Sequence, residues 1–183
     1  MGASDRPCYK HNYSFQFHEL KGARSVEVAF QQKPCSRPYP YTFEYNRTDR
    51  SISPRWRSEP LIRSGLSLCA GNLIVELGDE RQILECWGYF PREAWRTGTL
   101  TIPLAIPAQV FVPDDISLLS GVSARVPGAE HWVIVAVDGM NWIYFGTLEI
   151  DSRCSHAFIA EGLICSLALD RLVGLWLLVD QAI

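Results

Sequence analysis

Short runs that alternate apolar and polar residues are the feature that most constrains this chain. The stretch YTFEYN (41–46) puts Tyr41, Phe43 and Tyr45 on one face, a period of two that indicates a half-buried strand. Comparable apolar runs recur along the chain at 13–20, 25–30, 50–56, 72–77, 82–90, 131–137 and 140–150, with short polar segments between many of them. Such spacing is typical of β-hairpins. The sequence therefore predicts a mainly β fold, an antiparallel meander of hairpins forming a β-sandwich or filled barrel.

The run HWVIVAV (131–137) is apolar on both of its alternating faces. A strand of this kind is covered on both sides, so we expect it in the middle of the sandwich or barrel. The Asp138-Gly139 pair follows it, and both residues tolerate the positive φ of a type I′ hairpin turn. This pair predicts a tight connection to the next strand.

Prolines and weak helical signals mark the remaining segments. Residues 31–41 and 99–113 each carry three prolines, which predicts loops, corners or edge strands. The stretches PREAW (91–95) and PDDISLLSG (113–121) predict at most one or two short helices. Asp114 or Asp115 would cap the second helix and Gly121 would end it.

The C-terminal stretch GLICSLALDRLVGLWLLVDQAI (162–183) has three interpretations. A membrane span needs about 20 consecutive apolar residues, and Asp170-Arg171 interrupts this one, so no membrane association is predicted. A buried helix would be apolar around its whole circumference, and it stays as an alternative. The favoured interpretation is a hairpin that turns at Asp170-Arg171.

Charge is distributed unevenly along the 183 residues, which have the length of a single domain. Up to Leu68 the chain holds eleven Lys and Arg against six Asp and Glu, and the remainder holds six against fourteen. We therefore describe a single domain, 1–183, with a basic, aromatic front segment containing hairpins (1–64) and an acidic β-rich body (65–183). The net charge of -3 makes nucleic-acid binding an unlikely function.

The predicted compartment follows from the N-terminus and the cysteines. The first ten residues contain no apolar segment of the kind that a secretory signal requires. Six cysteines are irregularly spaced and none forms a C-x-x-C pair. We expect reduced thiols in a cytoplasmic protein.

Motifs of known catalytic chemistry are missing from the sequence. It contains no G-x-S-x-G, H-E-x-x-H or P-loop pattern. Asp151, Cys154 and His156 lie close together, but we interpret this stretch as a polar loop, because neighbours in sequence rarely have attack geometry. We predict no catalytic residues, no metal and no cofactor, although enzymatic activity stays an open question.

Aromatic residues carry the leading functional hypothesis. The stretch CWGYFPREAW (86–95) concentrates Tyr89, Phe90 and Trp95 around a glycine and a proline, and such side chains anchor many protein interfaces. We predict a non-catalytic cytosolic protein-binding domain whose partner is another protein, such as an inhibitor or immunity-type protein that neutralises its partner.

The alternative hypothesis is a small-molecule-binding or hydrolytic β-barrel. Paired carboxylates can divide acid and base roles, and Glu76, His131 or the pair Asp114-Asp115 would lie at the mouth of such a barrel. This alternative predicts an internal pocket.

Overall fold

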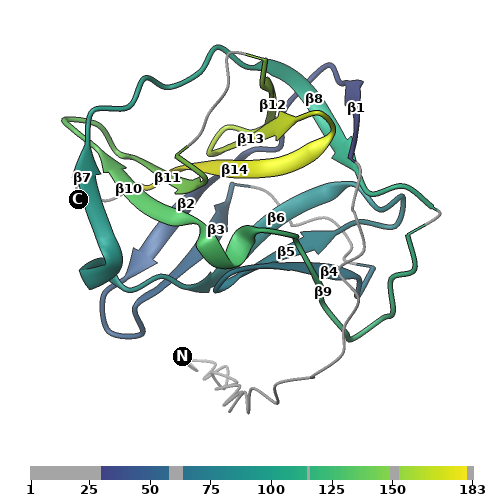
Figure 1. Ribbon diagram of the computed structural model, residues 1–183, viewed down its shortest axis with the longest axis horizontal. Coiled ribbons are helices and arrows are strands. Elements are labelled where there is room, and N and C mark those ends of the chain that lie inside the picture. The colour runs from purple at the N-terminus through teal and green to yellow at the C-terminus, as the bar shows by residue number, and fades with distance from the viewer. Residues whose placement is uncertain (1–29, 58–63, 115, 149–152, 181–183) are drawn as a thin grey trace, which may run out of the picture.

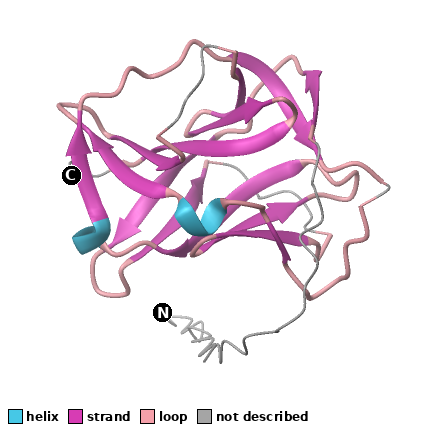
Figure 2. Cartoon of the chain, viewed as in Figure 1, coloured by secondary structure: helices cyan, strands magenta, loops and turns pink. Residues whose placement is uncertain are grey.

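The computed structural model describes residues 30–57, 64–114, 116–148 and 153–180, and it is almost entirely β. The predicted strands at 13–20 and 25–29 lie outside the described residues. Fourteen strands and two 3-10 turns are described (Figures 1 and 2). The strands are β1 (Gln31–Pro34), β2 (Tyr41–Asn46), β3 (Ser51–Trp56), β4 (Ser67–Ala70), β5 (Leu73–Leu77), β6 (Ile83–Tyr89), β7 (Trp95–Gly98), β8 (Ile106–Phe111), β9 (Ala124–Arg125), β10 (Val133–Val137), β11 (Trp142–Gly146), β12 (Ser155–Ala160), β13 (Leu163–Ala168) and β14 (Arg171–Leu178); the turns are η1 (Arg92–Ala94) and η2 (Ala129–His131).

The described residues form two sheets, which confirms the mainly β class and is consistent with a β-sandwich. The larger sheet has the order β1-β8-β12-β13-β14-β11-β10-β7, and the smaller has the order β2-β3-β6-β5-β4-β9. Hairpins of consecutive strands, as predicted, supply six of the twelve neighbouring pairs, but β7–β10, β8–β12 and β4–β9 are parallel. A simple antiparallel meander is therefore wrong in these places, because the three parallel pairs join strands that are distant in sequence.

Strand β10, which the sequence predicts to be covered on both faces, has apolar residues packed against each of its faces. Ile134 of β10 packs into the core between the sheets, whereas Val135 and Val137 pack into a second cluster on the outer face of the larger sheet. Residues of the segment between β7 and β8 cover this outer cluster, including Leu100 and Ile102. The alternation of β10 thus supplies side chains to two apolar layers.

The C-terminal stretch is a hairpin, and the helical alternative is wrong for it. Strands β13 and β14 pair antiparallel, and the φ angles of Leu169 and Asp170 are 48° and 62°. The turn therefore lies one residue earlier than predicted, and Arg171 already belongs to β14. In the 137–142 connection only Gly139 has a positive φ, because four residues join the strands and no type I′ turn is needed.

Two expectations about prolines and helices need correction. Residues 113–121 form turns among the described residues instead of a helix, with the Ile116 amide donating to the Pro113 carbonyl. Strand β8 is not an edge, since it lies between β1 and β12; Pro107 is tolerated there because its pairing with β12 spans only two residues. The short turn after Pro91 and the edge position of β1 are as predicted.

None of the helical segments within the described ranges has the length and hydropathy needed to cross a membrane.

Candidate functional site

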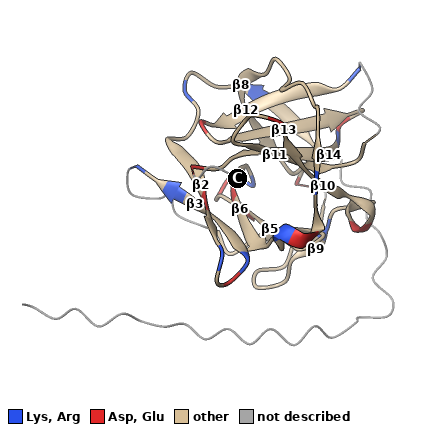
Figure 3. Ribbon diagram, turned by 90° about the vertical axis from the view of Figure 1, so that its left-hand side faces the viewer, with Lys and Arg blue, Asp and Glu red and all other residues tan. Residues whose placement is uncertain are grey.

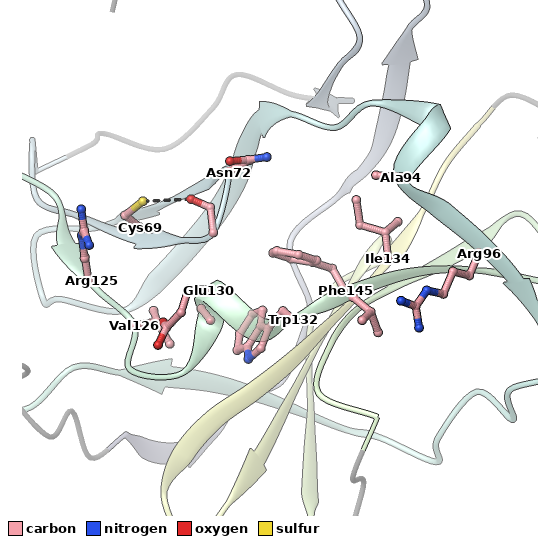
Figure 4. Close-up of a pocket in the computed structure, with 13 residues that line it drawn as sticks. Cys69, Asn72, Ala94, Arg96, Arg125, Val126, Glu130, Trp132, Ile134 and Phe145 are labelled. Carbon is pink, nitrogen blue, oxygen red and sulfur yellow. Dashed lines mark hydrogen bonds between the residues drawn. The ribbon is translucent and has the colours of Figure 1, made fainter. Parts of the chain in front are cut away.

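A pocket of about 540 Å³ is lined by residues of both sheets. Among them are Arg96 of β7 and Arg125 of β9, and each of these strands lies at one end of its sheet. We call this cavity the seam pocket (Figure 4). Its walls come from the β4–β5 turn, the end of η1, β7, the β9–η2 segment and the adjoining parts of β10 and β11. The lining residues are Cys69, Gly71, Asn72, Ala94, Arg96, Arg125, Val126, Ala129, Glu130, Trp132, Val133, Ile134 and Phe145.

Local backbone geometry shapes one wall of the seam pocket. Gly71 has a φ of 58°, and a Cβ there would lie 3.0 Å from the ring of Phe145 and 3.3 Å from the Ala129 carbonyl oxygen. Glycine therefore suits this turn both for its conformation and for its close approach to the floor. The parallel pairing of β4 with β9 then sets Cys69 beside Arg125.

Aromatic rings form the floor. Phe145 is buried, and its ring meets Trp132 edge to face at 5.2 Å and Phe90 at 5.5 Å. Trp132 is half-buried, so part of its indole faces the pocket. Edge-to-face pairs of this kind hold each ring in place, and the floor is therefore a fixed apolar surface.

Two arginines give the pocket its charge. Arg96 and Arg125 lie toward opposite ends of the pocket, with Phe145 and Trp132 between them in Figure 4. Neither guanidinium forms an ion pair with any residue in the described part of the chain. Glu130 is the single acidic residue of the lining, and its carboxylate lies 3.7 Å from the ring of His131. The lining thus carries a net positive charge.

Cys69 brings a thiol into the pocket, but one in its neutral form. Burial raises its pKa, and the nearby Arg125 opposes this shift only in part. The thiol also donates a hydrogen bond to the Gly71 carbonyl oxygen at 3.2 Å. A nucleophilic cysteine needs thiolate at neutral pH, so Cys69 is better suited to packing. Among the described residues, no three His, Cys, Asp or Glu side chains gather closely enough to hold a metal ion.

The three aromatic residues singled out in the sequence do not form an exposed cluster. Tyr89 is 48% exposed, whereas its neighbour Phe90 is 1% exposed and belongs to the core. Trp95 is half-buried and packs against Tyr45 at 5.0 Å. Adjacent residues at the end of β6 face opposite sides, so Tyr89 and Phe90 cannot both reach a partner.

The predicted polar residues are also scattered. Glu76 lies on the outward face of β5 and accepts a hydrogen bond from Trp87 Nε1 at 3.0 Å. Asp114 has a 99% exposed side chain, 3.5 Å from Arg81 Nη1, and Asp115 lies outside the described residues. His131 is exposed beside the seam pocket without lining it. These groups do not converge on a shared catalytic position.

His156 is held by a buried hydrogen-bond chain outside the seam pocket. Its Nδ1 atom lies 2.9 Å from Ser166 Oγ, and Trp176 Nε1 donates to the same oxygen at 3.1 Å. Ser166 has no exposed surface, so a substrate could not reach its hydroxyl. The chain is therefore a packing feature of the outer face of the larger sheet.

Sequence reasoning missed most of the seam pocket. Its residues come from stretches between positions 69 and 145 that only tertiary pairing brings together. One signal was present in the sequence. The body has only six Lys and Arg against fourteen Asp and Glu, so each of its arginines is a candidate for a specific contact.

No family model, curated protein or solved structure matches the chain.

Proposed function

We propose that this chain is a non-catalytic protein-binding domain and that the seam pocket is where its partner docks. The observation that carries the proposal is an aromatic floor flanked by two arginines that have no ion-pair partner among the described residues. Tryptophan and arginine dominate the energetic centres of protein interfaces. The proposal keeps the class of function that the sequence suggests and moves the site away from Tyr89, Phe90 and Trp95.

The form of the pocket supports a protein partner over a small molecule. Asn72, Ala94, Arg96, Arg125 and Glu130 on its rim are exposed. Sites for small molecules typically enclose about 70–90% of the ligand surface, whereas a protein partner covers such a rim with its own surface. A hydrolytic barrel has less support still, because the predicted polar residues lie apart.

We further propose that the protein acts in the cytoplasm. We also propose that it is an inhibitor or immunity-type protein, which neutralises its partner by binding it. The five cysteines of the described part carry free thiols, which suits a reducing compartment. A neutralising protein needs a stable complex with one partner, and a rigid aromatic floor lowers the entropy lost when the complex forms.

Capture from the native lysate with quantitative mass spectrometry tests the proposal. Trp132→Ala removes part of the floor, and Trp142→Ala removes a half-buried tryptophan that packs in the outer cluster instead. We expect a partner that wild type and Trp142→Ala retain and Trp132→Ala loses. Asn72→Trp, which fills the pocket from its exposed rim without deleting a packed side chain, should lose it as well. A partner retained equally by all four proteins would refute the site.

A further inference from the structure

We infer that the seam pocket receives an extended acidic segment of a partner protein, with an apolar side chain on the floor and carboxylates on both sides of it that reach Arg96 and Arg125. This inference rests on the proposed function and names the chemistry of the partner segment.

First, the two ends of the seam pocket carry positive charge, from Arg96 at one end and Arg125 at the other. Several basic residues elsewhere are engaged within the molecule: Arg50, Arg55 and Arg57 pair with acidic residues of the body, and Arg81 pairs with Asp114. Arg92 lies 6.0 Å from the ring of Trp95.

Arg96 and Arg125 differ from these residues, because no described acidic side chain lies within ion-pair distance of either. The exposed Arg37 and Arg47 also lack such a partner among the described residues, but they lie outside the pocket. Arginine forks bind carboxylates in a bidentate manner. Two such forks at opposite ends of one pocket (Figure 4) fit two acidic side chains better than one.

The second step is the backbone that flanks the pocket. Strands β7 and β9 are terminal strands of their sheets, so one edge of each lacks a strand partner among the described residues. The opposite terminal strand of the smaller sheet, β2, is covered instead: the amides of Gly162 and Asp180 donate to the carbonyls of Tyr41 and Phe43. An extended peptide binds an open edge through main-chain hydrogen bonds. A small carboxylate would leave these groups unused, which favours a peptide segment.

The third step is the floor between the arginines. The floor is lined by Phe145, Ile134 and the exposed part of Trp132. Their carbon atoms offer an apolar surface that gives no hydrogen bonds to a polar group of the partner. A leucine, isoleucine or aromatic side chain of the partner would gain free energy by leaving water there. The segment therefore alternates acidic and apolar side chains.

Selection from a displayed library of random linear peptides tests this inference with purified wild-type protein. We expect enrichment of peptides with Asp or Glu on both sides of an apolar residue. A selected peptide should bind Arg96→Glu/Arg125→Glu at least about tenfold more weakly and should lose affinity as salt rises. Arg96→Gln/Arg125→Gln should give an intermediate loss, and peptides selected on the Glu variant should carry Lys or Arg instead.

The matched control is Arg37→Glu/Arg47→Glu, which makes the same charge change at two exposed positions outside the pocket and should leave peptide affinity within about twofold. Failure to enrich acidic peptides, or equal binding to both charge variants, would overturn the inference. So would a small aromatic carboxylate that competes as tightly as the peptide, or a labelled single-stranded nucleic acid that binds more tightly.

The two proposals fail differently. If Trp132→Ala abolishes capture of the partner while the arginine variants do not alter peptide binding, the function stands and the acidic segment is wrong. If capture is independent of Trp132 and of the Asn72→Trp block, the site itself is wrong.

Discussion

Ser166 is a polar residue without exposed surface that joins two ring nitrogens on the outer face of the larger sheet. Its hydroxyl accepts from Trp176 Nε1, and it donates to His156 Nδ1 when the neutral imidazole carries its proton on Nε2. A buried polar group is tolerated only when its hydrogen bonds are satisfied. We therefore expect the Ser166 hydroxyl to contribute to the stability of this part of the sheet.

Replacing Ser166 tests that dependence. Ser166→Ala leaves Trp176 Nε1 and His156 Nδ1 without this partner, so we expect the free energy of unfolding to fall by about 1–3 kcal/mol. Urea denaturation measures it. Ser155→Ala, at an exposed position of β12, is the matched control and should change the free energy little. Similar losses in both variants would contradict the role assigned to Ser166.

His156 predicts how stability depends on pH. Burial lowers its pKa below the ordinary value of 6.5, so the unfolded chain binds a proton at a pH where the folded protein does not. Stability should therefore fall as the pH drops below about 6.5, with no contribution from this group above that value. Urea unfolding of His156→Gln at about pH 7.5 and about pH 5.5 should show a smaller fall than wild type. An equal fall in both proteins would assign the pH dependence to other groups.

Burial of individual residues was predictable where strand alternation decides it. Tyr41, Phe43 and Tyr45 are buried as the alternation of β2 predicts. The glycine and proline around Phe90 favour a surface anchor, yet strand alternation sets its side chain on the opposite side from Tyr89, in the core. The arginines of the seam pocket were not predictable, since nothing local distinguishes a paired from an unpaired arginine.

Hairpins are the elements that the sequence predicts best, because strand and turn signals are local. The pairs β2–β3, β5–β6, β10–β11 and β13–β14 all occur where apolar runs flank short polar segments, and all four are antiparallel pairs of consecutive strands. The parallel pairs were not predictable, because their strands are joined through long segments. Strand β9 is only two residues long and exists through its contact with β4.

The turn of the last hairpin contains a residue poorly suited to its backbone. Leu169 has a φ of 48° and an 84% exposed side chain, and a left-handed conformation costs a branched residue about 1–2 kcal/mol. Leu169→Asn should raise the free energy of unfolding by roughly 1 kcal/mol, because asparagine tolerates this region. Thermal or urea unfolding measures the gain.

The control for that change is Leu104→Asn, which removes a 96% exposed leucine at a position without positive φ. An equal gain from both substitutions would assign the effect to surface polarity and not to the backbone of the turn.

At the scale of the whole molecule, part of the uneven charge of the sequence is matched by ion pairs within the described residues. Arg50, Arg55 and Arg57 of the front segment each lie against an acidic residue of the body, and charged residues occur on and around both sheets (Figure 3). Exposed pairs of this kind add little stability. What distinguishes Arg96 and Arg125 from the exposed Arg37 and Arg47 is that they lie on either side of an aromatic floor in one pocket.

The pocket itself is a property of the assembled sheets. Its floor belongs to the larger sheet and the segment before β10, its glycine turn to the smaller sheet, and the carbonyl oxygen of Ala129 in η2 lies close to Gly71. No single hairpin contains enough of it to be recognised in the sequence, so the fold class was predictable and the site was not.

Hydrogen–deuterium exchange of the protein with and without its captured partner tests the central claim most directly, since it locates the docking surface. We predict that binding slows exchange in residues 69–72, 95–98 and 124–134, which surround the seam pocket, and leaves the region around Tyr89 unchanged. Protection confined to the β3–β6 region around Tyr89, with unchanged exchange at the pocket, would contradict the account.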